Sequence, residues 1–176
     1  MRSVLEQPPK TLMEVFKNLP EGTLAELIND NLYMSPSPAF KHQKLLFSIA
    51  KKLSELTQRM GEVIISPFDV YLDEQKNAVQ PDIIFVRNEN QSIIDESGHI
   101  HGVPDLVFEI LSPGNKEHDL IIKKDLYEKF GVKEYWIVDP ETRLTLGYQL
   151  QKGLYQKISE ELGQVNSPLL ALNFQF

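Results

Sequence analysis

The segment PDLVFEIL, residues 104–111, places two acidic residues in a run of apolar, strand-forming residues. Because side chains alternate between the two faces of a strand, Asp105 and Glu109 share one face with Val107 and Leu111. A carboxylate in an apolar strand is costly to bury unless a partner compensates it. The segment therefore predicts a buried strand in which Glu109 has either a structural or a functional partner.

A second acid occurs in the preceding segment VQPDIIFV, residues 79–86, where Asp82 follows Pro81 at the entry to an apolar run. Taken alone, a Pro-Asp pair before a strand is ordinarily a turn or a cap. If the two strands are neighbours, Asp82 and Glu109 converge on one cation. Oxygen ligands favour Mg²⁺ or Mn²⁺ with water completing the coordination. Such an ion polarises a phosphoryl oxygen and lowers the pKa of a bound water.

Residues 119–130 follow with helical periodicity, and Gly131 is placed to end the helix. Asp119, Lys123 and Tyr127 recur every four residues and lie on one helical face. A lysine near the two acids would orient a water or help to deprotonate it, and would offset developing negative charge. The simpler explanations are a solvated lysine or an Asp119–Lys123 ion pair, and three other lysines compete for the role: Lys116, Lys124 and Lys129.

The segments around these motifs predict one domain, residues 1–176, in which helices cover a mixed sheet. A short helix at 11–19 precedes a hairpin of strands 24–28 and 31–34, with Asn29-Asp30 as the turn. Residues 39–60 form a long helix with a basic polar side, which either meets a phosphate backbone or is an ordinary solvated face. The basic residues of that side are Lys41, Lys44, Lys51, Lys52 and Arg59. Further strands are expected at 62–66, 69–72, 134–138, 144–150 and 153–158.

Composition narrows the classes of function. The chain has no cysteine, which removes disulfides, zinc-thiolate sites and thiol nucleophiles. Its net charge of -7 disfavours a protein that coats nucleic acid, yet a metal and a local basic patch still permit a nuclease. The first residues lack the apolar stretch of a secretion signal, and no apolar run is long enough to span a membrane. These features lead us to expect a cytoplasmic protein that does not bind membranes.

The ordered motifs resemble those of the Uma-two family of restriction-type endonucleases. The matching segments are VQPD (79–82), VPDLVFEILSP (103–113), the Asp119, Lys123, Tyr127 series and GVKEYWIVDP (131–140). At the N-terminal side, ELI (26–28) and MSPSP (34–38) with His42 match the same family. The resemblance extends from about Leu24 to Pro140 and into the tail.

This family is similar to the PD-(D/E)XK nucleases, which share an α-β-β-β-α-β core and cleave phosphodiesters with magnesium. The resemblance implies a restriction-endonuclease-like α/β (α+β) fold with an added N-terminal hairpin and C-terminal strands. It implies that Asp82 and Glu109 bind the metal. The superfamily lysine would stand at Leu111, so the resemblance instead assigns the catalytic lysine to Lys123 on the following helix. Further candidates for the pocket are Glu26, His42, Asp105, Asp119 and Tyr127.

Three functions remain open. The first is a nuclease that uses Mg²⁺ or Mn²⁺, with nucleic acid, and DNA foremost, as substrate. The second is a catalytically silent module of the same fold that binds nucleic acid or protein, and the third is a metal-dependent hydrolase of a small phosphorylated molecule. A homodimer is also expected, because the apolar residues of the tail need cover: Leu169, Leu170, Phe174 and Phe176.

Overall fold

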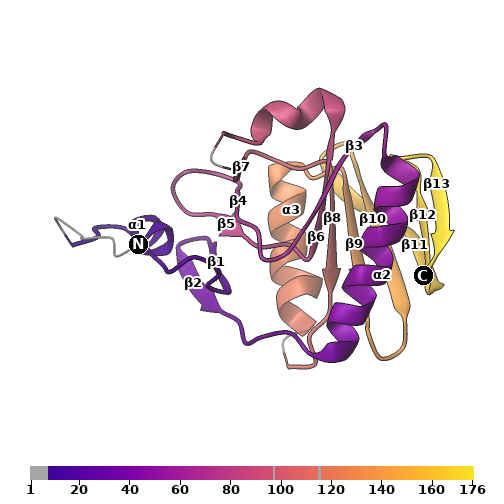
Figure 1. The fold of residues 1–176 in the computed structure, drawn as a ribbon, viewed down its shortest axis with the longest axis horizontal. Coiled ribbons are helices and arrows are strands. Elements are labelled where there is room, and N and C mark those ends of the chain that lie inside the picture. The colour runs from indigo at the N-terminus through magenta and orange to yellow at the C-terminus, as the bar shows by residue number, and fades with distance from the viewer. Residues whose placement is uncertain (1–7, 97, 115) are drawn as a thin grey trace.

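A six-stranded mixed sheet with a helix on each face forms the centre of the structure (Figure 1). The computed structural model describes residues 8–96, 98–114 and 116–176. The strands of this sheet run in the order β11-β10-β9-β8-β6-β3, and only the β8–β9 pair is parallel. Their bounds are β3 Gly61–Ile65, β6 Ile83–Arg87, β8 Leu106–Ile110, β9 Glu134–Val138, β10 Leu144–Gln151 and β11 Leu154–Leu162.

A smaller mixed sheet, ordered β2-β1-β5-β4-β7, lies next to the short helix α1 (Leu12–Lys17). Its strands are β1 Ala25–Ile28, β2 Asn31–Met34, β4 Val70–Tyr71, β5 Ala78–Val79 and β7 Ile100–His101. The predicted hairpin is confirmed as β1–β2. Asn29 and Asp30 both have positive φ, at 49° and 64°, which is the conformation that a two-residue hairpin turn requires.

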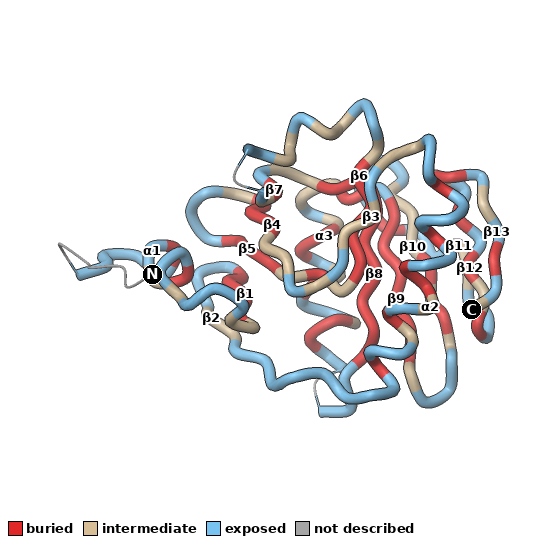
Figure 2. The backbone as a smooth tube through the Cα atoms, viewed as in Figure 1, coloured by how far each residue is buried: buried red, intermediate tan, exposed pale blue. Residues whose placement is uncertain are grey.

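The two faces of the large sheet carry separate apolar clusters. In Figure 2 the strands β6, β8 and β9 are coloured as buried over most of their length. Helix α2 (Phe40–Thr57) covers one face with Leu46, Ile49 and Leu53, which pack in the cluster of Phe108 and Trp136. Helix α3 (Lys124–Phe130) covers the other face with its own apolar side chains. The elements α2, β3, β6, β8, α3 and β9 follow one another as the expected α-β-β-β-α-β core. The predicted α/β sandwich is therefore confirmed.

The first acid-bearing segment is not one continuous strand, which corrects the sequence prediction. Strand β5 ends at Val79 in the small sheet, and β6 begins at Ile83 in the large sheet. Pro81 has no N–H to donate to a strand ladder, and the backbone N–H of Gln80 bonds to the side chain of Glu26. Asp82 consequently lies at the crossing between the two sheets and not within a strand.

The lysine-bearing helix also departs from the prediction in its first turn. His118–Lys123 is π-helical and leads directly into α3, which begins at Lys124. Turns of this kind widen the backbone and recur at functional sites. The end of the helix is as predicted, because Gly131 has φ 91° and caps it. Among the helices of the described residues, none is both long and apolar enough to cross a membrane.

The C-terminal tail forms a hairpin, β12 (Gln164–Ser167) with β13 (Leu172–Gln175), that the sequence did not predict. Its apolar side chains pack on the α2 face of the chain's own sheet, with Leu170 and Phe174 buried and Leu169 and Phe176 partly buried. The chain itself therefore covers these residues at least in part, and the homodimer stays a prediction.

Glu134, at the start of β9, fixes this tail. Its carboxylate accepts hydrogen bonds from the hydroxyl of Ser167 at 2.6 Å, the backbone N–H of Leu169 at 2.6 Å and the indole of Trp136 at 3.1 Å. Burial raises its pKa, although these donors oppose the shift. Glu134 is thus a structural acid in the core.

We expect Glu134→Ala to lower the free energy of unfolding by about 3 kcal/mol, because buried donors left without an acceptor cost about 1–3 kcal/mol each. Urea denaturation of the variant and of Glu161→Ala, an exposed glutamate of β11, measures the difference. Equal midpoints for the two variants would contradict the role assigned to Glu134.

Candidate active site

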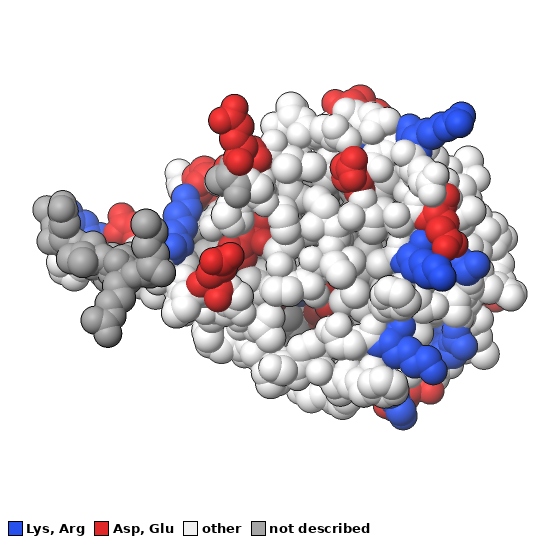
Figure 3. Space-filling model, in the orientation of Figure 1, with Lys and Arg blue, Asp and Glu red and all other residues white. Residues whose placement is uncertain are grey.

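A cavity of about 500 Å³ lies where the small sheet, helix α2 and the π-helical turn meet the ends of β6 and β8. Figure 3 shows the corresponding recess, with acidic atoms at its floor. All three predicted catalytic residues line it, together with three of the five additional candidates. The lining side chains used below are Glu26, His42, Gln80, Asp82, Glu109, His118, Asp119 and Lys123.

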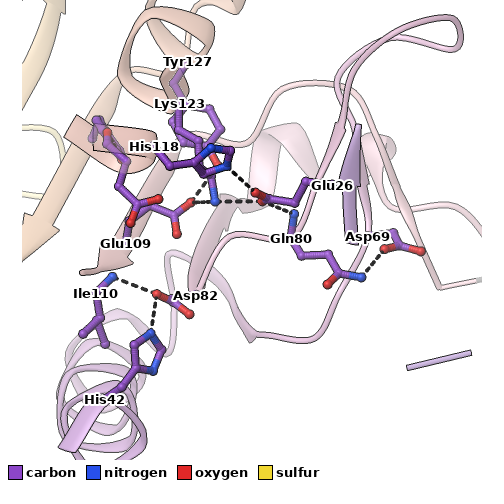
Figure 4. Close-up of polar contacts among 12 residues, drawn as sticks. Glu26, His42, Asp69, Gln80, Asp82, Glu109, Ile110, His118, Lys123 and Tyr127 are labelled. Atoms are coloured by element: carbon purple, nitrogen blue, oxygen red, sulfur yellow. Dashed lines mark hydrogen bonds and ion pairs between the residues drawn. The ribbon is translucent and has the colours of Figure 1, made fainter. Parts of the chain in front are cut away.

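Asp82 joins the crossing between the sheets to the end of β8. Its Oδ2 accepts a 2.7 Å hydrogen bond from the backbone N–H of Ile110 and lies 3.0 Å from Nε2 of His42 (Figure 4). The bond to Ile110 places this carboxylate beside the residue that follows Glu109. Strands β6 and β8 are neighbours, as predicted, with Ile83 opposite Phe108, so the residues next to that pair, Asp82 and Glu109, lie at the same end of the two strands.

Glu109 lies in the middle of the buried strand β8 and has the partners that its burial requires. Its Oε1 accepts from Nζ of Lys123 at 2.5 Å and from the hydroxyl of Tyr127 at 2.8 Å. Lys123 and Tyr127 come from the π-helical turn and from α3, so the helix delivers both donors to one oxygen. The side chain of Lys123 is itself buried, which excludes the simpler explanation of a solvated lysine.

Glu26 approaches the same lysine from the opposite side, from strand β1. Its Oε1 lies 2.8 Å from Nζ of Lys123 and accepts from the backbone N–H of Gln80 at 2.9 Å, and its Oε2 lies 3.0 Å from Nε2 of His118. Figure 4 shows Lys123 between Glu26 and Glu109, with its ammonium group pointing toward both carboxylates. The N-terminal hairpin is therefore part of the site.

The pocket holds more negative than positive charge. Four carboxylates line it, and Lys123 is their one lysine partner among the described lining residues. Burial raises the pKa of Glu109 well above its usual range, and the neighbouring acids add to the shift. Burial likewise raises the pKa of Asp119 to about 6, aided by Glu26 and Asp82. The positive charge of Lys123 partly opposes the rise in pKa of both carboxyl groups.

Two basic groups of the pocket, Lys123 and His42, have raised pKa values. Burial alone would lower the pKa of Lys123, but Glu109, Glu26 and Asp119 raise it well above its usual value. Lys123 therefore stays protonated and acts as a donor and a positive charge, not as a base. For His42, the hydrogen bond and charge of Asp82 outweigh burial and raise the pKa above 6.5. Its Nδ1 is buried and has no hydrogen-bond partner among the described residues.

Asp119 offers a direct test of the charge excess. Its pKa is higher in the folded state than in the unfolded state, so the folded state binds the proton more tightly. The resulting stabilisation is complete below the unfolded pKa near 3.8 and is lost as the pH rises through about 6. We expect Asp119→Asn to stabilise the metal-free protein by about 2 kcal/mol at pH 7 and by less than about 1 kcal/mol at pH 4.

Thermal unfolding with a chelator present, at both pH values, measures this difference. Asp125→Asn is the matched control, because Asp125 is an exposed acid in the following turn. A stabilisation of Asp119→Asn that is the same at pH 4 and pH 7 would contradict the electrostatic explanation.

The donor set suits a hard divalent cation. In the described part of the chain, Oδ1 of Asp82 and Oε2 of Glu109 make no hydrogen bond or ion pair, so each carboxylate keeps one oxygen for a ligand. No three His, Asp or Glu side chains among the described residues gather closely enough to hold a metal by themselves. Mg²⁺ differs from zinc in needing only one or two carboxylates, since water and substrate phosphates complete its shell.

Asp105 is not part of the pocket, which corrects its inclusion among the candidates. It shares a strand face with Glu109, but it lies before the other end of β8. There its carboxylate accepts from Lys133 at 2.6 Å and from the backbone of Arg87 at 2.9 Å. Tyr127 does not line the cavity but contacts Glu109 from behind it.

Two members of the site were not among the sequence candidates. His118 holds the second oxygen of Glu26 and packs edge-on against Tyr33, with ring centroids 4.8 Å apart. Gln80 donates its backbone N–H to Glu26, and its side chain bonds to Asp69 at 2.8 Å. Their adjacency in sequence to Asp119 and Asp82 was the available signal, but only the approach of β1 gives either residue its partner.

Comparison with solved structures supports the fold. A crystal structure from Anabaena variabilis, described as "a putative nuclease belonging to DUF820", is similar with a TM-score of 0.74, at 22% identity over 95% of each chain. Among curated proteins no relative matches the sequence. The model of the Uma2 family, described as "Putative restriction endonuclease", matches residues 13–176. With the match extending over nearly the whole sequence, this chain belongs to the Uma2 family.

Proposed function

We propose that this protein is a metal-dependent nuclease that hydrolyses phosphodiester bonds of nucleic acid, with DNA as the first substrate to test. The observation that carries the proposal is the convergence of four carboxylates on a pocket whose one lysine is buried between two of them. A structural ion pair would need one acid for one lysine. The surplus of buried negative charge is what a bound divalent cation compensates.

Asp82 and Glu109 are the proposed ligands of Mg²⁺ or Mn²⁺, each through the oxygen that has no partner among the described residues. When bound, the ion polarises a phosphoryl oxygen and lowers the pKa of a coordinated water. The remaining roles belong to the protein. His42 and the backbone of Ile110 orient the carboxylate of Asp82, while Tyr127 orients that of Glu109.

Lys123 is the proposed electrostatic group. Because it stays protonated, it assists the attack of water by donating hydrogen bonds and by offsetting the negative charge that develops on the phosphate. Glu26 holds the ammonium group from the side opposite Glu109, and His118 in turn holds Glu26. The lysine is therefore positioned before the substrate arrives, which lowers the reorganisation needed during the reaction.

The test combines metal binding with cleavage. Calorimetry with Mg²⁺ and with Mn²⁺ is applied to the wild type, to Glu109→Ala and to Glu117→Ala, an exposed acid just before the π-helical turn. The same samples then receive single- and double-stranded DNA and RNA. We expect binding and cleavage in the wild type and in Glu117→Ala, and loss of both in Glu109→Ala.

Other outcomes identify the alternatives. No metal binding by the wild type would reject the proposal and favour a catalytically silent binding module of the same fold. Hydrolysis of a phosphorylated nucleotide, with no cleavage of polymeric nucleic acid, would instead favour a hydrolase of small molecules. Metal binding with neither activity would contradict the assignment as a nuclease on these substrates.

A further inference from the structure

The outer face of helix α2 carries two phenylalanines that alternate with two lysines. Phe40, Lys44, Phe47 and Lys51 follow one another at helical spacing and fall within about 60° on the helix surface. All four are exposed, and the side chains of Phe40 and Phe47 are 79% and 68% accessible. We refer to these four residues as the Phe/Lys stripe.

An ordinary solvated face does not account for the stripe. The lysines suit such a face, and a single exposed apolar residue is common. Two phenylalanines in one line are not explained in this way, because the buried side of α2 already supplies the apolar residues that pack in the core. Their rings add nothing to packing in the described structure and remain in water beside cations.

The stripe begins at the mouth of the pocket. Ala39, the residue before Phe40, lines the cavity, and His42 reaches the same cavity from the buried side of α2, opposite the stripe. From there α2 extends for about 27 Å away from the site (Figure 1). In Figure 3 the Lys and Arg side chains gather mainly over the α2 side of this face, and Asp and Glu predominate on the opposite side. The distribution of charge on this face therefore favours an anion that approaches the pocket along α2.

The charges of the stripe are available for a ligand. Lys44 makes no ion pair among the described residues, and Lys51 is only 3.9 Å from the exposed Glu55. Aromatic rings that alternate with exposed lysines match the two surfaces of a nucleic-acid strand. Bases stack on the rings, and phosphates lie against the ammonium groups. The 10 Å that separates Phe40 from Phe47 along the axis is the span of about three nucleotides at stacked spacing.

The geometry points to a binding track for single-stranded nucleic acid along the Phe/Lys stripe, which leads the strand into the pocket. This inference rests on the proposed nuclease function and specifies its substrate as an unpaired strand or a frayed end. In a duplex the base faces are already stacked on one another, so none is available to stack on Phe40 or Phe47. A second copy of the chain is a poorer occupant, because symmetric pairing of this face would bring like-charged lysines together.

The binding experiment is fluorescence anisotropy with labelled 12-nucleotide single strands of DNA and RNA and with a matched blunt duplex. A chelator is present, so binding is measured independently of metal and cleavage. We expect the single strands to bind more tightly than the duplex. Phe47→Ala should weaken single-strand binding about tenfold, the loss typical of one stacked base. Lys44→Ala should weaken it less and reduce the slope of log K against log salt by about 0.7.

The controls are Leu162→Ala, a 70% exposed apolar residue of β11, and Lys129→Ala, an exposed lysine of α3, and both should bind like the wild type. Equal effects of Phe47→Ala and Leu162→Ala, preference for the duplex, or no binding at all would each overturn the track. Light scattering is run in parallel. A change of mass in Phe47→Ala without a change in binding would assign the stripe to self-association and reject the inference.

The two proposals fail in distinguishable ways. Metal-dependent cleavage of duplex DNA that Phe47→Ala leaves unchanged would refute the track and retain the nuclease. Single-strand binding through the stripe, with no cleavage by the wild type in Mg²⁺ or Mn²⁺, would refute the nuclease and retain a binding surface.

Discussion

Lys123→Met is expected to lower the free energy of unfolding of the metal-free protein by about 3–5 kcal/mol at pH 7, the usual effect of removing one partner from a buried ion pair. The variant leaves Glu26 and Glu109 buried without the ammonium group that lies 2.8 Å and 2.5 Å from them. Methionine fills a similar volume, so the loss reports charge rather than a cavity.

The pH dependence identifies this cause. Without Lys123 the pKa of Glu109, already raised by burial, rises further above its unfolded value. Protonation of such acids favours the folded state, so the penalty should shrink as the pH falls from 7 to 5. Urea denaturation at both pH values measures it, and Lys129→Met, an exposed lysine of the same helix, is the control. A penalty that does not change with pH would reject the electrostatic explanation.

The same substitution should lower the rate of nucleic-acid cleavage by at least about 100-fold, because one preorganised donor at a site of developing charge contributes about that much. The rate is measured under conditions in which circular dichroism shows the variant to be folded. A folded Lys123→Met that cleaves at the wild-type rate would remove Lys123 from the proposed chemistry and leave it a structural role alone.

Glu26→Gln is expected to destabilise the metal-free protein by about 2–3 kcal/mol at pH 7. Burial opposes ionisation of this carboxyl, but Lys123, His118 and the backbone of Gln80 together hold its pKa at about 2. A folded pKa below the unfolded value near 4.5 means that the ionised acid stabilises the fold above pH 4.5. That stabilisation is lost as the pH falls toward 2.

The expected signature is therefore a penalty that falls by more than half between pH 7 and pH 3. Asp119→Asn should behave in the opposite sense, because the pKa of Asp119 is raised and not lowered. Glu21→Gln, an exposed acid before the same hairpin, is the control for Glu26. Equal destabilisation by Glu26→Gln at pH 7 and pH 3 would mean that packing, and not charge, explains the effect.

Local signals in the sequence were sufficient for the elements of the core. Asn29-Asp30 between two apolar runs predicted the hairpin, because few residues adopt positive φ readily. The period of Ile49 and Leu53 predicted α2, and alternation in PDLVFEIL predicted a strand that carries Glu109 inward. The hairpin, the helix and the strand each depend on residues that are neighbours in sequence, so the sequence pattern was sufficient to predict them.

Features that depend on contacts between residues far apart in sequence were predicted less well. The C-terminal hairpin was missed because β12 and β13 are short, and they are held by Glu134 and by the core cluster under α2 rather than by their own pattern. Asp105 was assigned to the pocket because it shares a strand face with Glu109, whereas the pocket lies only at the other end of that strand.

For the site, the sequence by itself indicated the two acids, Asp82 and Glu109, from residue type and position, and the resemblance to the family selected Lys123 from four candidate lysines. Only the tertiary structure decided that Lys123 is buried between Glu109 and Glu26, that His118 holds Glu26, and that Asp82 is oriented by the backbone of Ile110. Residue type fixes which charges a segment can present. Which of them share a pocket depends on contacts between distant segments, such as Asp82 with Ile110, 28 residues apart, and Glu26 with His118, 92 residues apart. Those contacts set the burial and the pKa values from which the chemistry follows.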